Sequence, residues 1–465
     1  MTAFLEADLD TITGLDALGV RLDGDLAQPG DPEWDVARLA WHLDVDQRPV
    51  AVVHAASVDD VILTVDAARE LGLRVAPQGT GHNAAPLGPL DGTILLKTSP
   101  MRGVTVDPVR KVARAEAGAL WMDVVPLAYE HGLTALAGSS PDVGVVGYTV
   151  GGGISWHARS LGLASSNVVA VELVTADGTF RRVDDEHDPE LFWAIRGGGG
   201  AFGIVTAIEI RLFEFSEVQA GILFFPLERA GEVLHAWREW VEAVPPEVTS
   251  VGRMLRFPPL PELPPFLSGQ SYVVVEAVLR MEPADADRLL APLRALGPAI
   301  DTVHPTPTSE LGQLHMDPPG PVPAAGDGML LTGLPYEAIE ATLAASGPGV
   351  DSPLLSVEFR HLGGAIAPGG STGGAVTGFD AAFAMFAVGI TPTPEAGVAV
   401  RAAVDAVQNR LAPWSTGHVY LNFAERHKAG SALFEADTFR RLQQVKATYD
   451  PTDLIRSNHP IPPAS

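Results

Sequence analysis

Six glycines within the sixteen residues Gly138–Gly153 constrain the fold of this chain more than any other feature. The segment, GSSPDVGVVGYTVGGG, is the most glycine-dense part of the first half of the 465-residue chain. A second glycine-rich loop, GTGHNAAPLG, spans Gly79–Gly88. Backbone N–H groups in such turns form concavities that bind anions without the help of a helix. The two loops together therefore predict a site for a cofactor that carries a pyrophosphate.

The residues around these loops alternate between strand and helix patterns. A strand is expected at 49–55 and a helix at 57–72, where Ser57 and Asp60 occupy capping-box positions and Gly72 ends the helix. Apolar alternation around ADG predicts a hairpin at 167–183. After about residue 215, strands and helices alternate between proline-rich loops. This change predicts a second domain, built on a sheet that helices cover.

Charge and cysteine usage exclude several classes of protein. A net charge of −26, with no cluster of Lys and Arg, argues against nucleic-acid and anionic-membrane partners. The absence of Cys excludes disulfides, iron–sulfur clusters and a cysteine nucleophile. The first residues, MTAFLEADLD, do not read as a secretory signal, and no apolar run reaches membrane-spanning length. We expect a cytoplasmic protein, monomeric or homo-oligomeric.

Two familiar motifs are present without the context that their chemistry needs. Gly369–Gly373 matches G-x-S-x-G around Ser371, but its flanks read as a flexible loop rather than as a strand entering a helix. GGGIS at 151–155 and RGGGGAFG at 196–203 lack the strand-to-helix setting of a dinucleotide fingerprint, and a strand follows the second. Neither a serine hydrolase nor a Rossmann site is favoured.

Longer stretches of the chain resemble one family, the berberine bridge enzyme-like flavoproteins of the vanillyl-alcohol oxidase superfamily. Within 49–214 the matching segments are PQGTGHNA, GSSPDVGVVGYTVGGGIS, GLASSNVVAVELVTADG and ELFWAIRGGGGAFGIVT. YLNF and YDPTDLIRSNHPIPP resemble the closing segment of the family, and EFRHLGGAIA resembles a stretch of its bacterial members.

The resemblance implies an α+β fold of two domains. The FAD-binding domain of the PCMH type would comprise residues 1–214, with its core at about 46–214. A substrate-binding domain with an antiparallel sheet covered by helices would follow at 215–404. Residues 405–465 would return to the FAD domain.

The same resemblance implies FAD as cofactor and no metal. His82 matches the histidine that the family bonds to the flavin 8α-methyl group, and Ser140 replaces the cysteine that in many members bonds to C6, so a single covalent link is expected. Val143 matches a position near flavin C4a where valine accompanies oxidases and leucine accompanies dehydrogenases. The other cofactor-binding residues expected are Gln78, Gly79, Thr80, Gly81, Asn83, Leu87, Gly138, Ser139, Gly144, Gly147, Tyr148, Gly152, Gly153, Asn167, Gly203, Ile204, Val205, Tyr420, Asn422 and Asn458.

The implied reaction removes a hydride from a small organic substrate, an alcohol, sugar or amine-type carbon. Flavin N5 would receive the hydride, and O2 would be reduced to H2O2. Two alternatives stay open: a flavin dehydrogenase with another electron acceptor, and a flavin-binding protein without turnover.

Tyr420 of YLNF matches a tyrosine that often acts as general base in the family. An ordinary tyrosine pKa of about 10 would require a relay or a depressed value for this role. Arg360 and His361 are candidates for that help. Glu358 is a second candidate base, because alternation places it and Arg360 on one face of a strand. Trp156 fits a pocket wall and a packed core equally well.

Overall fold

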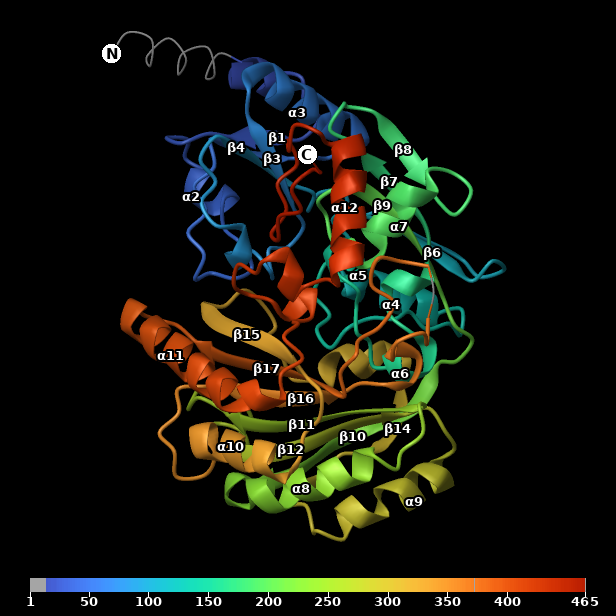
Figure 1. Ribbon diagram of the computed structural model, residues 1–465, viewed down its shortest axis with the longest axis vertical. Coiled ribbons are helices and arrows are strands. Elements are labelled where there is room, and N and C mark those ends of the chain that lie inside the picture. The colour runs from blue at the N-terminus through green and yellow to red at the C-terminus, as the bar shows by residue number, and fades with distance from the viewer. Residues whose placement is uncertain (1–13, 372, 465) are drawn as a thin grey trace.

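The structure is a computed structural model that describes residues 14–371 and 373–464 (Figure 1). The stretch MTAFLEADLD, on which the expectation about a secretory signal depends, lies outside these ranges. Two smaller sheets form the upper half of the molecule in Figure 1, and one large sheet forms the lower half. Across the described ranges, none of the helices combines the length and apolar character that a membrane crossing needs.

The first sheet has four strands in the order β1-β2-β4-β3, with parallel pairing of β2, β4 and β3. The helix α3 (Val58–Leu71) connects β2 to β3 and begins and ends as expected, because Ser57 Oγ accepts from the N–H of Asp60 and Gly72 adopts φ 67°. The Asp60 carboxylate bonds to the backbone N–H groups of residues 23, 24 and 56 instead of completing a capping box. The strands are β1 (Asp25–Ala27), β2 (Ala51–His54), β3 (Arg74–Gln78) and β4 (Thr93–Lys97), and α2 (Trp34–Ala37) lies between β1 and β2 in the chain.

The second sheet is antiparallel, with the strand order β5-β6-β9-β7-β8. The hairpin expected at 167–183 is formed by β7 and β8, with Val171 opposite Val183. The glycine-rich stretch 138–153 contains the short helix α5. The strands are β5 (Val104–Asp107), β6 (Val112–Glu116), β7 (Val168–Val174), β8 (Phe180–Val183) and β9 (Ile204–Arg211), and the helices are α4 (Trp121–Tyr129), α5 (Val145–Val150), α6 (Ala158–Leu161) and α7 (Pro189–Gly198).

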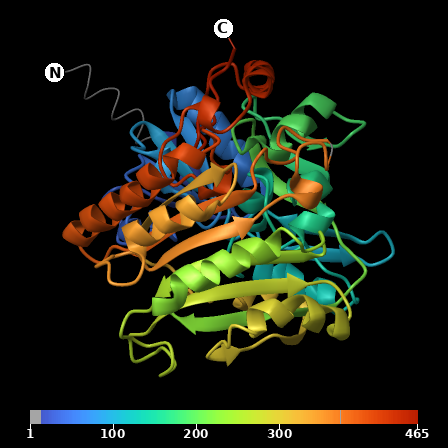
Figure 2. The same cartoon turned by 60° about the horizontal axis from the view of Figure 1, so that its bottom comes forward.

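The third sheet is antiparallel and runs β13-β10-β12-β11-β16-β17-β15, with β14 also beside β10. Four helices cover one of its faces, and Figure 2 shows them in front of the strands. The strands are β10 (Glu217–Pro226), β11 (Val248–Arg256), β12 (Ser271–Leu279), β13 (Ile300–Asp301), β14 (His304–Pro307), β15 (Ala324–Leu331), β16 (Ser356–His361) and β17 (Phe383–Ile390). The helices are α8 (Ala230–Val241), α9 (Pro283–Arg294), α10 (Tyr336–Ser346) and α11 (Pro394–Leu411).

The helix α11 belongs to the core of the large sheet along its whole length. Val400, Val404, Val407 and Leu411 are all buried in the same apolar cluster as Trp237. The expected domain boundary between residues 404 and 405 therefore falls inside a helix that packs as one unit until Leu411.

The C-terminal segment then returns to the upper half of the molecule. The helix α12 (Ala436–Tyr449) lies beside α7 (Figure 1). The Lys446 ammonium donates to the carbonyl oxygens of Ala201 and Ile455 and to the Asp450 carboxylate, at 2.6–3.0 Å. Residues 454–456 then pair with Val75 of β3. The C-terminal segment is thus joined to β3, directly before the glycine-rich loop at 79–88.

Candidate functional site

A cavity of about 450 Å³ has walls from all three sheets and from the C-terminal segment. Its volume lies in the range of sites for small molecules and cofactors. We call it the cofactor cavity. Glu358 and Arg360 line it, as do most of the expected cofactor-binding residues: Gln78, Gly79, Thr80, Gly81, His82, Asn83, Leu87, Gly138, Ser139, Ser140, Val143, Gly144, Gly147, Tyr148, Gly203, Val205, Tyr420, Asn422 and Asn458.

Four expected cofactor-binding residues lie behind the wall of the cavity. Ile204 is fully buried in an apolar core. The Asn167 amide donates to the carbonyl oxygens of residues 161 and 163, so it shapes a turn. Gly152 packs against the Tyr420 ring, and the N–H of Gly153 donates to the Tyr420 oxygen. These four residues support the wall from outside.

The His82 side chain is held on two sides. Its ring stacks on Trp41 with centroids 4.1 Å apart, and Nδ1 lies 2.7 Å from Thr80 Oγ1. Nε2 has no hydrogen-bond partner and lies 3.5 Å from the Asp142 carboxylate. Burial opposes ionisation of Asp142, but the nearby His82 imidazole and hydrogen bonds from Trp41 and Ser140 outweigh it and hold the pKa of Asp142 below its usual value.

The wall of the cofactor cavity fits a large polar cofactor such as FAD. Gly147 and Gly200 line it, and a Cβ added to either would meet no atom within 4 Å. Open space in front of backbone N–H groups is what close approach of a pyrophosphate or a flavin ring requires. Gln78 Oε1, His82 Nε2 and the Tyr148 hydroxyl are buried without partners on this same wall. Buried polar atoms are normally satisfied, so a bound polar group is expected to complete them.

Tyr420 does not lie on a strand but precedes a single 3₁₀ turn, Leu421–Phe423. Its phenolic oxygen accepts from the backbone N–H groups of Gly153 and Ile154, at 2.9 and 3.1 Å, and from the Asn422 amide at 2.8 Å. Burial raises the pKa of Tyr420 to about 12, although these donors and the charge of Arg360 act in the opposite direction.

Five charged side chains form a buried group beside Tyr420. Glu358 Oε1 accepts from Arg360 at 2.7 Å, and Glu358 Oε2 lies 2.9 Å from His315 Nε2. His315 Nδ1 meets Glu276 at 2.5 Å, and Arg253 lies 3.4 Å from Glu276. Burial opposes the charge of Glu358, but the cations around it hold the pKa of this carboxyl well below its usual range. The two carboxylates of this group, Glu358 and Glu276, are therefore paired with the cationic side chains around them.

Several lining residues were absent from the sequence-based expectations: Trp41, His42, Arg253, His315, Asp317 and Glu425. Burial and then the nearby charge of Asp327 raise the pKa of Glu425 to about 7, and its Oε2 has no partner. A sequence signal did exist for one member of the charged group, because Glu276 interrupts the apolar run of β12. Nothing in the local sequence distinguishes Trp41 or Glu425.

Three other residues considered in the sequence, His361, Trp156 and Ser371, do not line the cofactor cavity. His361 is neutral, because burial and then the charge of Arg159 lower its pKa to about 3, and it does not line the cofactor cavity. Trp156 is buried in an apolar cluster and lines a smaller pocket. Within the described ranges, Ser371 Oγ bonds to Ser166 Oγ and to the carbonyl oxygen of Thr377, which is not the arrangement of a hydrolase nucleophile.

Comparison with known protein families identifies two domains in this chain. Residues 49–184 match a profile described as FAD binding domain, and residues 419–462 match one described as berberine and berberine like. The chain therefore combines an FAD-binding domain with a berberine-like domain, and it is an FAD-linked oxidoreductase. The two matched segments lie far apart in the sequence, yet they contribute His82 and Tyr420 to the same cavity of this oxidoreductase.

Individual relatives cover different shares of this FAD-linked oxidoreductase. (R)-6-Hydroxynicotine oxidase of Paenarthrobacter nicotinovorans is 34% identical over 198 residues, and the alignment spans 43% of each chain. An uncharacterized FAD-linked oxidoreductase of Bacillus subtilis (strain 168), YgaK, is 27% identical over 95% of this chain and 98% of its own. The solved structure of Physcomitrella patens BBE-like 1 superposes with a TM-score of 0.83, at 22% identity, over 97% of this chain and 99% of that one. This last similarity shows the fold.

Proposed function

We propose that this oxidoreductase oxidises a small organic substrate, an alcohol, sugar or amine-type carbon, and passes the electrons to O2 to form H2O2. The observation that carries the proposal is the Tyr420 oxygen, which lies in the wall of the cofactor cavity with three N–H donors directed at it. FAD, when bound, supplies the hydride acceptor and returns the electrons to O2. The remaining chemistry belongs to side chains of this chain.

Tyr420 is assigned the role of proton acceptor for the substrate hydroxyl or ammonium group. A neutral phenol offers two lone pairs and one O–H, whereas a phenolate accepts three hydrogen bonds readily. The donors from Gly153, Ile154 and Asn422 therefore favour the phenolate form relative to a buried tyrosine without them. Arg360 adds a positive charge nearby. This combination offsets part of the cost of burial.

Glu358 is assigned a positioning role and not the role of base. Both of its oxygens are already engaged, one by Arg360 and one by His315. Its pKa is held low, so it would bind a substrate proton poorly. Its geometry instead holds the Arg360 guanidinium, which lies over the Phe423 ring at 5.0 Å.

His82 is proposed as the single covalent link to the flavin. The loop around it is close to the cavity, and Ser140 occupies the place where a second link would need a cysteine. Acid precipitation of the purified protein is the test. Yellow colour is expected in the pellet of the wild type and in the supernatant of His82→Ala. Colour in the wild-type supernatant would reject the bond.

Anaerobic mixing with alcohols, sugars and amines tests the reaction itself. Bleaching of the flavin absorbance by at least one class is expected, and no bleaching across the panel would reject turnover. Readmission of air then tests the acceptor: Val143 lines the cavity, and the family resemblance associates valine at this position with oxidases. Slow recovery of the yellow colour would indicate a dehydrogenase.

A further inference from the structure

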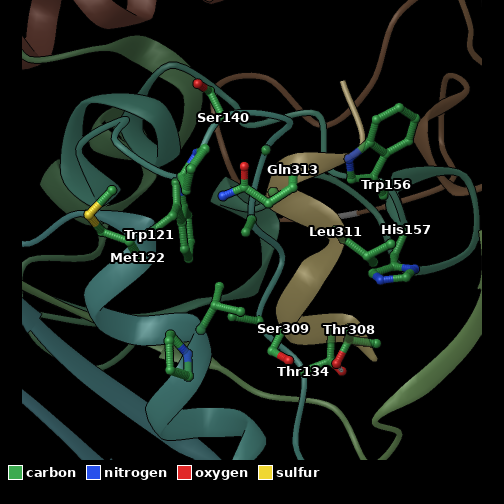
Figure 3. A pocket seen from close by; sticks show the side chains of 17 residues that line it. Trp121, Met122, Thr134, Ser140, Trp156, His157, Thr308, Ser309, Leu311 and Gln313 are labelled. Carbon is green, nitrogen blue, oxygen red and sulfur yellow. Dashed lines mark hydrogen bonds between the residues drawn. The ribbon is translucent and has the colours of Figure 1, made fainter. Parts of the chain in front are cut away.

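A second pocket of about 210 Å³ lies beside the cofactor cavity, and we call it the side pocket. Gly138 and Ser140 line both spaces. Figure 3 shows Trp121 on the side of α4, Trp156 and His157 on the opposite side, and Gln313 of the 3₁₀ helix Thr308–Gln313 between them. The side pocket is therefore adjacent to the place where the flavin is proposed to bind.

Three polar atoms of side-pocket residues have no hydrogen-bond partner. They are Nε1 of Trp121, Nε1 of Trp156 and Nε2 of His157. The three side chains are 1%, 5% and 4% exposed. An indole N–H can only donate, and a buried donor without a partner costs free energy. Unpartnered indole donors thus lie on two opposite sides of the side pocket (Figure 3).

The side pocket carries no charge. No Asp, Glu, Lys or Arg is among its lining residues. Burial, and then the charge of Arg280, lower the pKa of His157 to about 3, so this imidazole is neutral at physiological pH. Transfer of a charged molecule into such a site would be costly, because nothing there replaces its hydration. The expected occupant is uncharged, small, and carries accepting oxygens at opposite ends.

We propose that the side pocket binds an uncharged monocyclic quinone, which accepts electrons from the reduced flavin in addition to O2. The proposal rests on the function proposed above. A quinone ring carries its two carbonyl oxygens at opposite ends, which matches donors at Trp121 and Trp156. Two electrons and two protons pass from the reduced flavin to the quinone, so the flavin is oxidised and both carbonyl oxygens become hydroxyls of a hydroquinone.

The test uses the FAD-loaded protein and needs no substrate. The flavin is reduced with dithionite, excess reductant is removed anaerobically, and 2,3-dimethoxy-5-methyl-1,4-benzoquinone is added in a stopped-flow instrument. The rate of flavin reoxidation is expected to saturate with quinone concentration. Trp156→Phe removes the indole donor, and Ser309→Phe fills the pocket from a half-buried position while leaving the apolar core intact. Each is expected to raise the half-saturating concentration by about fivefold or more, and neither is expected to change reoxidation by O2.

Trp34→Phe is the matched control, because Trp34 lies in α2 outside both spaces. It is expected to leave the quinone kinetics unchanged. A linear dependence on quinone concentration would overturn the proposal, because it would indicate a second-order reaction without a saturable quinone complex. Saturation that both pocket variants leave unchanged would also overturn it, because the quinone would then bind in the cofactor cavity. A purified protein without flavin would overturn the proposed function, whereas a reducible flavin with linear quinone kinetics would overturn this inference alone.

Discussion

Tyr420 is a buried phenol whose oxygen accepts hydrogen bonds from one group of its own motif, the Asn422 amide, and from two N–H groups of a distant turn. Tyr420→Phe keeps the ring and removes the oxygen. Activity, measured as kcat/KM on whichever substrate bleaches the flavin, is expected to fall by about 10²–10⁴-fold. The N–H groups of Gly153 and Ile154 lose their acceptor, so the free energy of unfolding is expected to fall by about 1–3 kcal/mol.

The pH profile of the wild type distinguishes this role from simple packing. Because the pKa of Tyr420 lies at about 12, the phenolate fraction and hence kcat/KM should increase as the pH rises through the alkaline range. Tyr420→Phe should abolish this rise. Tyr336→Phe is a suitable control, since Tyr336 is 62% exposed on α10 and should leave both activity and profile unchanged. Wild-type kcat/KM in Tyr420→Phe would contradict the assignment.

Substitution of Gly147 can distinguish an effect on cofactor binding from an effect on the stability of the fold. It lies in α5 with helical neighbours, and a Cβ there would meet no atom of the protein within 4 Å. Gly147→Ala should therefore leave the unfolding of the flavin-free protein unchanged or slightly stabilised, by up to about 1 kcal/mol. Flavin affinity, measured by titration of the flavin-free protein with FAD, should weaken by about tenfold or more, because the methyl group enters the cofactor cavity.

Gly320→Ala controls for the loss of a glycine as such. Gly320 also has open space around it, but it does not line the cofactor cavity. The FAD affinity of the Gly320→Ala variant should equal that of the wild type. Full flavin affinity in Gly147→Ala would show that the cofactor does not approach this turn.

Individual elements followed local patterns closely. Ser57 and Gly72 delimit α3, and the alternation at 167–183 became a hairpin, because capping and period-2 burial act over a few residues. The strands 217–226, 248–256 and 271–279 lie in the part of the chain after residue 215 where alternating strands and helices were expected. The pairing of β11 with β16 was not readable, since it joins residues more than a hundred positions apart in the chain.

The return of α12 to the N-terminal half depends on one buried ion pair. Lys446 and Asp450 are 1% and 0% exposed, and Asp450 also accepts from the N–H groups of Leu454 and Ile455. Lys446→Met leaves Asp450 buried without its cation. The free energy of unfolding, measured by urea denaturation, is expected to fall by about 3–5 kcal/mol.

A second substitution tests the reason for that loss. Lys446→Met combined with Asp450→Asn removes the uncompensated charge and should recover part of the stability. Arg440→Met is the surface control, because its partner Asp437 is exposed and such pairs contribute at most about 1 kcal/mol. Equal stability of Lys446→Met and the wild type would mean that the C-terminal segment is held by apolar packing alone.

For the whole molecule, buried histidines determine the response to acid. His157 and His459 are each 4% exposed, and burial is the main reason that their pKa values are lowered to about 3 and about 4. The unfolded chain binds these protons near pH 6.5, whereas the folded protein does not. Stability is therefore present above pH 6.5 and is lost as the pH falls toward 4, by about 1.4 kcal/mol per pH unit for each histidine.

The measurement is the free energy of unfolding of the flavin-free protein between pH 7 and 5. His459→Gln should reduce the slope by one proton, and His187→Gln, at a site whose side chain is 69% exposed, should leave it unchanged. Glu425 acts with the opposite sign, because its raised pKa of about 7 stabilises the fold below pH 4.5 and this contribution is lost as the pH rises to 7. An unchanged slope in His459→Gln would contradict the account.

Local sequence patterns were sufficient to specify the main elements of the first half and the glycine-rich loops, and family motifs predicted that His82 and Tyr420 serve one cofactor. Turns, caps and alternation act over a few residues, so they are legible without a fold. Long-range packing is needed for Trp41 to stack on His82, for Glu358 to be held between His315 and Arg360, and for Tyr420 to receive donors from a turn 267 residues away. These contacts arise where separate sheets pack together, and that approach depends on the summed burial of many side chains rather than on any local pattern.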